Sequence, residues 1–535
     1  MTRTHSISGE AMKEPDADKF LEAMQQEVDD HTNRKHWELC KRSDLPEKAS
    51  VLPSVWSMKR KRRIATREVY KWKARLTVDG SKQKYGIHYD ETYSPVVQWS
   101  STRFFLIQAL LNNWYTHQID FVLAYAQAPV ERELYMEIPK GVNLEGADCK
   151  DYVLKLLKNL YGQKQAGRVW YNHLVNGLLE LGFVRSTTDE CVFYYNKSVL
   201  LVYVDDSILL GPDGKELKKL KEMIASKFDI QEEGDLCDYL GIQIKKQKNG
   251  TLTLTQPHLI ESILKDLKLN NQNTTGRKTP ALKTVLIHKD ADGKDFDNSF
   301  HYRSVIGKLN YLEKSTRPDI AYAVHQCARF SSCPKQSHAE AVKYICRYLA
   351  GTKDKGIVIR PEGNTFECFV DASHAGDWKQ QSAMDDPATA RSRTGYVLSF
   401  AKCPIIWGSK LQTEISLSTT EAEYIALSCA AREVLPVLSL AREAAKRGII
   451  NDVETPIIRC KMFEDNQGAV ELANVPKMRP RTKHINIKYH FFRQYVQDGT
   501  LQVQHIPGED QLADIFTKPL DVMTFVKHRN SILGW

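Results

Sequence analysis

The sequence predicts a multidomain α/β protein, and three observations support that prediction. The chain has 535 residues, which at roughly 100–200 residues per domain gives about three or four domains. Strand-length apolar runs alternate along the chain with segments of helical spacing. Acidic residues follow several of the apolar runs, where side chains from neighbouring elements can converge. Because 42% of the residues are hydrophobic, the chain can form several packed cores.

Charge and cysteine usage restrict the class of protein. The formal net charge is +9, which favours a polyanionic partner. The 11 cysteines form no Cys-x-x-Cys pair, which argues against a zinc knuckle or a disulfide framework and fits a reducing compartment. No run reaches the roughly 18 apolar residues that span a bilayer, and residues 1–14 lack an apolar signal core. We therefore expect a soluble, intracellular protein that does not cross a membrane.

The N-terminal part is expected to form a packing helix and a basic strand. The helix starts near Pro15, with Phe20, Met24 and Val28 on one face. Residues 70–78 alternate between apolar and basic side chains, as in a strand with one basic face. Such a face can neutralise phosphates, although a solvated strand surface is an equal alternative. The basic run at residues 59–63 resembles a nuclear-import signal or an exposed hairpin tip.

Residues 200–210 place two adjacent carboxylates between two strand-length apolar runs. We predict a strand, a tight turn carrying Asp205 and Asp206, and a returning strand. Two acids at such a tip suit a divalent cation, and a solvated hairpin tip is the alternative. Asp120 closes an earlier strand among apolar neighbours, where a carboxylate is costly unless it is paired or metal-bound. These three acids form a first candidate site.

The region from about residue 239 to 350 changes from strand to helical patterns. Residues 239–244 are expected to form one strand, and a polar linker spans about 270–299. Further helices are expected at 302–312 and 318–330. One more is expected at 337–349, with a Ser N-cap and Gly351 as its stop.

The last third is again α/β and carries a second acidic set. The acids lie at expected strand ends or helix starts, and they are Asp371, Glu423, Asp465 and Asp514. Several carboxylates around one point repel each other unless cations hold them. Two Mg²⁺ ions about 3.5–4 Å apart would serve phosphoryl transfer at each set, whereas any single acid could equally be a capping or surface carboxylate.

Several motifs taken together resemble those of copia-type (pseudoviral) LTR retrotransposon Pol polyproteins, in their reverse transcriptase and ribonuclease H portion. Residues 203–206 resemble the Tyr-x-Asp-Asp box of reverse transcriptases, and residues 118–125 resemble their first palm motif. Copia-type motifs are resembled by residues 70–76, 90–97, 160–171 and 239–242, and in the ribonuclease by residues 371–373, 418–424, 465–469, 483–485 and 513–520. The resemblance runs from about Trp37 to Leu520 in the family's order.

The resemblance implies a right-hand polymerase (fingers, palm and thumb) with a helical connection and a C-terminal ribonuclease-H-like α/β domain. The implied division is a lead helix at 1–36, fingers and palm at 37–250, thumb and helical connection at 251–360, the ribonuclease H domain at 361–520 and a tail at 521–535. It implies RNA-directed DNA polymerase activity, with DNA-templated synthesis as well, and cleavage of the RNA in RNA–DNA hybrids.

The resemblance also implies roles for residues of the polymerase site. Asp120 and Asp205 would ligate both metal ions, supported by Asp206. Tyr125 would exclude a 2′-hydroxyl, and Gln165 would line the nucleotide pocket beside Tyr203 of the Tyr-x-Asp-Asp box. Lys73 and Arg75 would hold the triphosphate, and Tyr239 with Gly241 would grip the primer end.

In the implied ribonuclease, Asp371, Glu423, Asp465 and Asp514 would hold two Mg²⁺ ions, with Mn²⁺ as an alternative metal. Glu421 competes with Glu423, which better matches the helix pattern of an acid followed three residues later by Ala. The loop at 507–510 lacks the mobile His of many ribonucleases H, so either product release differs or His505 acts instead.

The implied partners are an RNA template, a DNA primer and product, an RNA–DNA hybrid and deoxynucleoside triphosphates. A homodimer or an integrase from the same polyprotein are further partners, and the implied location is the cytoplasm, including virus-like particles, with nuclear entry. Two rival hypotheses are a nuclease whose polymerase half only binds hybrids, and a non-enzymatic nucleic-acid-binding protein. The presence of all seven expected acids argues against both.

Overall fold

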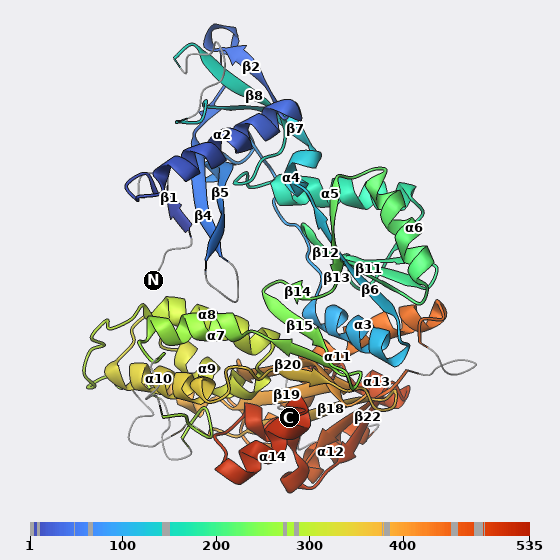
Figure 1. Ribbon diagram of the computed structural model, residues 1–535. Helices are drawn as coiled ribbons and strands as arrows, with labels where there is room; N and C mark the ends of the chain where they lie inside the picture. The colour runs from blue at the N-terminus through green and yellow to red at the C-terminus, as the bar shows by residue number, and fades with distance from the viewer. Residues whose placement is uncertain are drawn as a thin grey trace.

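In the computed structural model in Figure 1, the described residues form five β-sheets and their covering helices, which confirms the predicted multidomain α/β class. The structure describes residues 5–7, 11–47, 49–62, 68–141, 150–270, 275–282, 288–376, 378, 386–450, 458–475, 485 and 487–535. Arg63 in the basic run, Ile457 and the Lys483-His484 pair lie outside these ranges.

Two small sheets and one helix form the N-terminal part. β1 (His5–Ile7), β4 (Ser54–Arg62) and β5 (Val69–Val78) make one sheet, and β2 (Trp37–Lys41), β8 (Tyr152–Lys158), β7 (Pro129–Met136) and β3 (Val51–Leu52) make the other. The helix α2 (Ala17–Asn33) packs Phe20, Met24 and Val28 into a core with Leu76 of β5. The alternation predicted for residues 70–78 is present, with Ala74, Leu76 and Val78 buried.

A six-stranded sheet forms the centre of the second region, between residues 99 and 235. Its order is β13 (Ile230–Asp235), β6 (Tyr115–Phe121), β12 (Asp206–Gly211), β11 (Ser198–Tyr203), β10 (Val192–Tyr195) and β9 (Val184–Arg185). The helices α3 (Trp99–Leu111), α4 (Ala124–Gln127), α5 (Ala166–Glu180) and α6 (Gly214–Ala225) lie around it (Figure 1).

The β11–β12 turn is shorter than the sequence predicts. Tyr203 pairs directly with Asp206, so only Val204 and Asp205 form the turn and Asp206 begins the returning strand. Val204 has a φ of 58°, a positive value that tight two-residue hairpins require. The expectation that both acids lie in the turn is therefore wrong for Asp206.

A third region combines a small sheet with helices. The sheet contains β14 (Asp238–Tyr239), β15 (Ile242–Lys246), β16 (Leu252–Thr255) and β17 (Ile357–Ile359), and the helices are α7 (Pro257–Asp266), α8 (Tyr302–Ser315), η3 (Pro318–Ile320), α9 (Ala321–Ala328) and α10 (Gln336–Ala350). β15 pairs with β16, so the expected division at residues 250 and 251 falls within this sheet.

Two expectations for this region are corrected. Residues 239–244 do not form one strand, because Leu240 and Gly241 have positive φ values of 49° and 74° and turn the chain between β14 and β15. The helix α10 begins at Gln336, with Lys335 and not a serine at its N-cap, whereas Gly351 does end it.

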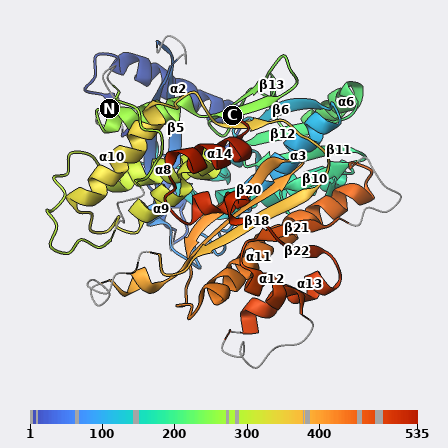
Figure 2. The same ribbon diagram turned by 90° about the horizontal axis from the view of Figure 1, so that it is seen from below.

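The C-terminal sheet has the order β20 (Cys403–Leu411), β19 (Arg393–Phe400), β18 (Phe366–Ser373), β21 (Cys460–Glu464) and β22 (Leu501–His505). β20 and β19 pair antiparallel, as do β19 and β18, whereas β21 and β22 run parallel to β18. The helix α11 (Thr419–Lys446), with Ser418 at its N-cap, runs along β18 and β19, and Figure 2 shows it with α12 (Gln467–Asn474) and α13 (Arg493–Gln497) beside it.

The remaining C-terminal elements are η8 (Leu512–Phe516) and α14 (Val522–Leu533). By length and composition α11 could cross a membrane, but 67% of its most apolar window is buried inside the protein, as expected of the core helix of a sheet. The six-stranded sheet region and the C-terminal sheet share one hydrophobic core, since Phe104 of α3 contacts Phe366 and Phe400.

Candidate active sites

The hairpin β11–β12 and the neighbouring strand β6 bring together the first three predicted acids. Asp206 pairs directly with Asp120 of β6, so the two carboxylates lie on the same face of the sheet. Asp205 lies at the turn, where its carbonyl oxygen accepts a 3.0 Å hydrogen bond from the Phe121 backbone N–H. All three acids are half-buried, so they remain accessible from solvent.

Hydrogen bonds from Trp170 and Val97 to backbone carbonyl oxygens fix the position of this hairpin. Trp170 of α5 is buried, and its indole Nε1 donates a 2.8 Å hydrogen bond to the Val204 carbonyl oxygen. The Val97 backbone N–H donates to the carbonyl oxygen of Val202. The turn that carries Asp205 is therefore held rigidly against α5, as a site that positions metal ions requires.

The side chains of Tyr125, Tyr161 and Arg75 pack against one another beside the hairpin. The ring of Tyr125 lies 4.6 Å, centroid to centroid, from the ring of Tyr161, and the guanidinium carbon of Arg75 lies 4.0 Å from the centre of Tyr161. Burial raises the pKa of both tyrosines, and the Asp205 carboxylate raises it further. Arg75 and Tyr125 thus both face the hairpin acids, and Tyr161, which sequence reasoning missed as a functional residue, connects them.

A glycine makes the approach of Tyr161 to β5 possible. The Val78 backbone N–H donates a 2.8 Å hydrogen bond to the Tyr161 carbonyl oxygen. Gly162 has a φ of 91°, and a Cβ on it would lie 2.1 Å from the Val78 carbonyl oxygen. Only glycine fits this position. The loop that contains Tyr161 is thereby fixed to the strand that contains Arg75.

The remaining predicted substrate-binding residues surround this stack. Gln165 is buried at the start of α5, where its side-chain oxygen accepts a 3.0 Å hydrogen bond from Gln83 Nε2. Lys73 pairs across the sheet with Lys59, so two basic residues lie opposite each other on β4 and β5.

The residues of the predicted primer grip lie close to Asp206. Tyr203 is half-buried opposite Asp206, whereas Tyr239 is almost fully buried and packs edge-on against Trp99 at 6.2 Å. Burial raises the pKa of Tyr239 strongly, and the Asp206 carboxylate adds to the shift. Gly241 lies in the tight turn between β14 and β15.

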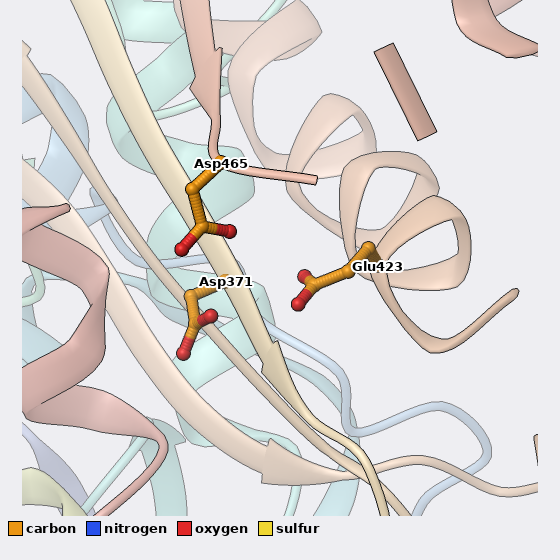
Figure 3. Close-up of side chains that lie close together, drawn as sticks. All are labelled: Asp371, Glu423 and Asp465. Atoms are coloured by element: carbon orange, nitrogen blue, oxygen red, sulfur yellow. The ribbon is translucent and has the colours of Figure 1, made fainter. Parts of the chain in front are cut away.

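Three of the four predicted C-terminal acids converge. Ligand oxygens of Asp371, Glu423 and Asp465 all lie within 4.8 Å of one another, and Figure 3 shows Glu423 pointing from α11 toward the two aspartates. The register explains the convergence, because Asp371 and Asp465 each lie two residues beyond the paired Phe369 and Phe463 of the parallel strands β18 and β21. Among the described residues, only this set brings three carboxylates so close.

Glu421, the competing acid, lies elsewhere on the same helix. Its backbone N–H donates to the Ser418 hydroxyl, and its carboxylate accepts a 2.7 Å hydrogen bond from the Leu417 backbone N–H. These bonds cap the helix start. The structure therefore gives Glu421 a capping contact and places Glu423 in the carboxylate cluster.

A fifth acid lies behind the cluster and was missed by sequence reasoning. Glu464 is fully buried, and its Oε1 accepts a 3.0 Å hydrogen bond from the Asn466 backbone N–H. Burial raises the pKa of Glu423 and of Glu464 well above their ordinary values, and the neighbouring carboxylates raise both further. Strand alternation was the available signal, since Cys460, Met462 and Glu464 all face inward.

Asp514, the fourth predicted acid, is bound to a lysine. Its Oδ1 lies 2.7 Å from Lys518 Nζ, and burial together with the charge of Asp371 raises the pKa of Asp514 to about 7. Burial likewise raises the pKa of Asp465, and Asp371 adds to that shift. His505 is exposed, and its Nε2 lies 3.1 Å from the Asp465 carbonyl oxygen.

The donor set fits a hard divalent cation. Carboxylate oxygens are the ligands that Mg²⁺ and Mn²⁺ prefer. Glu423 Oε2 is buried and has no hydrogen-bond partner, a costly state that a bound cation would relieve. Asp371, Glu423 and Asp465 could therefore hold a metal ion at this place.

Comparisons with known proteins agree with the polymerase half of this description. Residues 34–283 match the family model described as reverse transcriptase (RNA-dependent DNA polymerase). The chain is 34% identical over 521 residues to the retrovirus-related Pol polyprotein from transposon RE1 of Arabidopsis thaliana, with 96% of this chain and 34% of that protein covered. It is 32% identical over 520 residues to the corresponding polyprotein from transposon TNT 1-94 of Nicotiana tabacum, with 95% and 37% covered.

The chain thus spans about a third of the length of the curated relatives that it matches. A solved structure of the foamy viral protease-reverse transcriptase dRH in complex with double-stranded DNA is similar over 91% of this chain and 69% of that chain, at 12% identity and a TM-score of 0.47. The chain belongs to the copia-type retrotransposon Pol polyproteins, with a reverse transcriptase domain at residues 34–283 followed by a C-terminal α/β domain.

Proposed function

We propose that this chain is an RNA-directed DNA polymerase that also cleaves the RNA strand of RNA–DNA hybrids. The observation that carries the proposal is the presence of two separate carboxylate sets on one chain of this family. One lies at the β11–β12 hairpin, and the other lies between β18, β21 and α11. Each set suits divalent cations, which in phosphoryl transfer activate the attacking oxygen and stabilise the leaving one.

At the polymerase set, the chain's own residues would orient an incoming deoxynucleoside triphosphate. Asp120, Asp205 and Asp206 would hold two metal ions, Mg²⁺ or Mn²⁺. Arg75 and Lys73 would pair with the phosphates, and the position of Arg75 beside Tyr161 supports this role. The Tyr125 ring, packed against Tyr161, would form the floor under the sugar and leave no space for a 2′-hydroxyl.

At the C-terminal set, Asp371, Glu423 and Asp465 would hold the metal ions around the scissile phosphate of the RNA strand, with Asp514 completing the set. The buried Glu464 behind them would add negative charge to this set and so strengthen its attraction for cations. The substrates would be an RNA template, a DNA primer and the hybrid product. We further propose that the chain acts in the cytoplasm, within the virus-like particles of its retrotransposon.

A primer-extension assay and a hybrid-cleavage assay on the same two variants test the proposal. Asp205→Asn should abolish incorporation of deoxynucleotides on an RNA template with Mg²⁺ while leaving hybrid cleavage near wild type, because the hairpin acids belong only to the first set. Asp465→Asn should do the reverse. An Asp205→Asn chain that extends primers at the wild-type rate would overturn the site assignment, and a wild-type chain inactive in both assays would favour a non-enzymatic binding protein.

A further inference from the structure

The C-terminal centre contains a built-in cation beside its fourth acid. Lys518 Nζ lies 2.7 Å from Asp514 Oδ1, whereas the oxygens of Asp371, Glu423 and Asp465 gather within 4.8 Å of one another without Asp514. An ammonium group at this distance from a carboxylate occupies the kind of place that a metal ion would take. Asp514 is thus engaged by the chain itself and is not in the cluster of three.

The local backbone determines this pairing. The Lys518 backbone N–H donates a 3.2 Å hydrogen bond to the Asp514 carbonyl oxygen, so one turn of chain separates the two residues and their side chains lie on one side. The intervening Thr517 is buried, and its hydroxyl donates to Asp371 Oδ2 and to the Asp514 carbonyl oxygen. The segment 514–518 therefore contacts both the cluster and its outlying acid.

The two partners differ in their access to water. The Asp514 side chain is only 11% exposed, whereas that of Lys518 is 46% exposed. Asp371 and Asp465 also attract the Lys518 ammonium. A long lysine side chain with its head near the surface can turn to a phosphate that arrives from solvent, while a buried aspartate can only exchange one cation for another.

We propose that Lys518 keeps Asp514 out of the metal centre until the phosphate of a bound nucleic acid draws the ammonium away, so that the second metal ion is loaded only together with substrate. This inference rests on the proposed ribonuclease function of the centre. It assigns the first ion to Asp371, Glu423 and Asp465, and it makes Lys518 a positioning residue for Asp514. Without substrate, Asp514 therefore stays paired with Lys518 and is not available to bind a second metal ion.

Calorimetric titration with Mn²⁺ tests the proposal on the full chain. An Asp120→Asn/Asp205→Asn parent weakens the polymerase set, so that the C-terminal centre dominates the signal. The parent should bind one Mn²⁺ at this centre, and Lys518→Met should gain a second ion with an affinity about 10-fold or more above any second event in the parent. Adding a hybrid whose RNA strand is 2′-O-methylated, and hence uncleavable, should give the parent the second ion as well.

Two further variants separate this role from a general charge effect. Lys518→Arg keeps a cation beside Asp514 and should titrate like the parent. Lys527→Met removes a neighbouring lysine of α14 that pairs with Asp510 at 2.9 Å, outside the cluster, and should also titrate like the parent. If Lys518→Met and the parent give the same isotherms with and without hybrid, or if the parent binds two ions without hybrid, the proposal is wrong.

Failure of the ribonuclease function has a different signature. Cleavage of an unmodified hybrid in Mg²⁺ is measured on the same samples. Cleavage together with unchanged isotherms overturns the role of Lys518 alone. A second Mn²⁺ in Lys518→Met without any cleavage by the parent supports the role of Lys518 in metal loading and overturns the ribonuclease.

Discussion

The two carboxylate sets differ in how deeply the fold buries them. Asp120, Asp205 and Asp206 lie half-buried at a hairpin and on its neighbouring strand. In the C-terminal set, Asp371 is 3% exposed and Glu423 is 6% exposed, with the fully buried Glu464 behind them. In the second set, burial favours the protonated forms of Glu423 and Glu464 unless a cation offsets their charge. Burial therefore makes the C-terminal centre the more sensitive of the two to pH and to metal removal.

The largest expected effect separates two acids of one helix. Glu423→Gln should lower hybrid cleavage by about 10³-fold, because it removes one ligand charge from the buried cluster. Glu421→Gln should leave cleavage near wild type, since a glutamine can still accept the backbone N–H of Leu417. Single-turnover cleavage of a labelled hybrid measures both. The opposite ranking would move the catalytic role to Glu421 and remove the cluster of three from the mechanism.

A smaller effect tests the consequence of burial directly. Glu464→Gln should raise the free energy of unfolding by about 1–3 kcal/mol at pH 8 in EDTA, because it removes a carboxyl group that burial disfavours in its charged form. Thermal or denaturant unfolding followed by circular dichroism measures the change. Asp205→Asn at the half-exposed set is the matched control and should change stability little.

The pH dependence of that effect follows from the sign of the pKa shift. Burial raises the pKa of Glu423 and Glu464 above the ordinary value of 4.5, so the folded chain keeps protons that the unfolded chain has already released. This contribution to stability is fully present below pH 4.5 and is lost as the pH rises through the raised values. The gain from Glu464→Gln should therefore vanish near pH 4.5. A gain of equal size at pH 4.5 and pH 8 would show that packing, and not charge, is its cause.

The hairpin acids and the C-terminal acids could be predicted from sequence because each follows a short apolar strand or starts a helix. The closeness of Asp206 and Asp120 follows once β12 is placed beside β6. The choice of Glu423 follows from its position on the inward face of the helix α11. Glu464 was missed because a buried charged side chain contradicts the usual pattern, although its strand alternates correctly. The role of Tyr161 could not be found, because its contact with Arg75 is tertiary. The Lys518–Asp514 pair is local in sequence, but the position of Asp514 outside the cluster of three is set by how distant elements pack.

The smallest expected effect concerns the polymerase set. There, contacts of Tyr161 with Arg75 and Tyr125 position the side chains that would bind the nucleotide. Tyr161→Ala should raise the KM for deoxynucleotides about 5–10-fold with a smaller change in kcat, because Arg75 loses its cation–π contact and Tyr125 its packing partner. Tyr125→Ala should increase incorporation of ribonucleotides, because the Tyr125 ring would leave no space for a 2′-hydroxyl. Tyr161→Ala should increase it too, but less.

Steady-state incorporation of matched deoxy- and ribonucleotides measures both changes in Tyr161→Ala. Tyr161→Phe keeps the ring and should behave like the wild type, and Tyr152→Ala, at a tyrosine of β8 that packs in the N-terminal core, controls for a general loss of packing. If Tyr161→Ala leaves both the KM and the sugar discrimination unchanged, then the hairpin acids position the nucleotide without the tyrosine stack. Nucleotide binding at the half-buried polymerase set would then depend on its metal ions alone, as we expect for substrate binding at the buried C-terminal set.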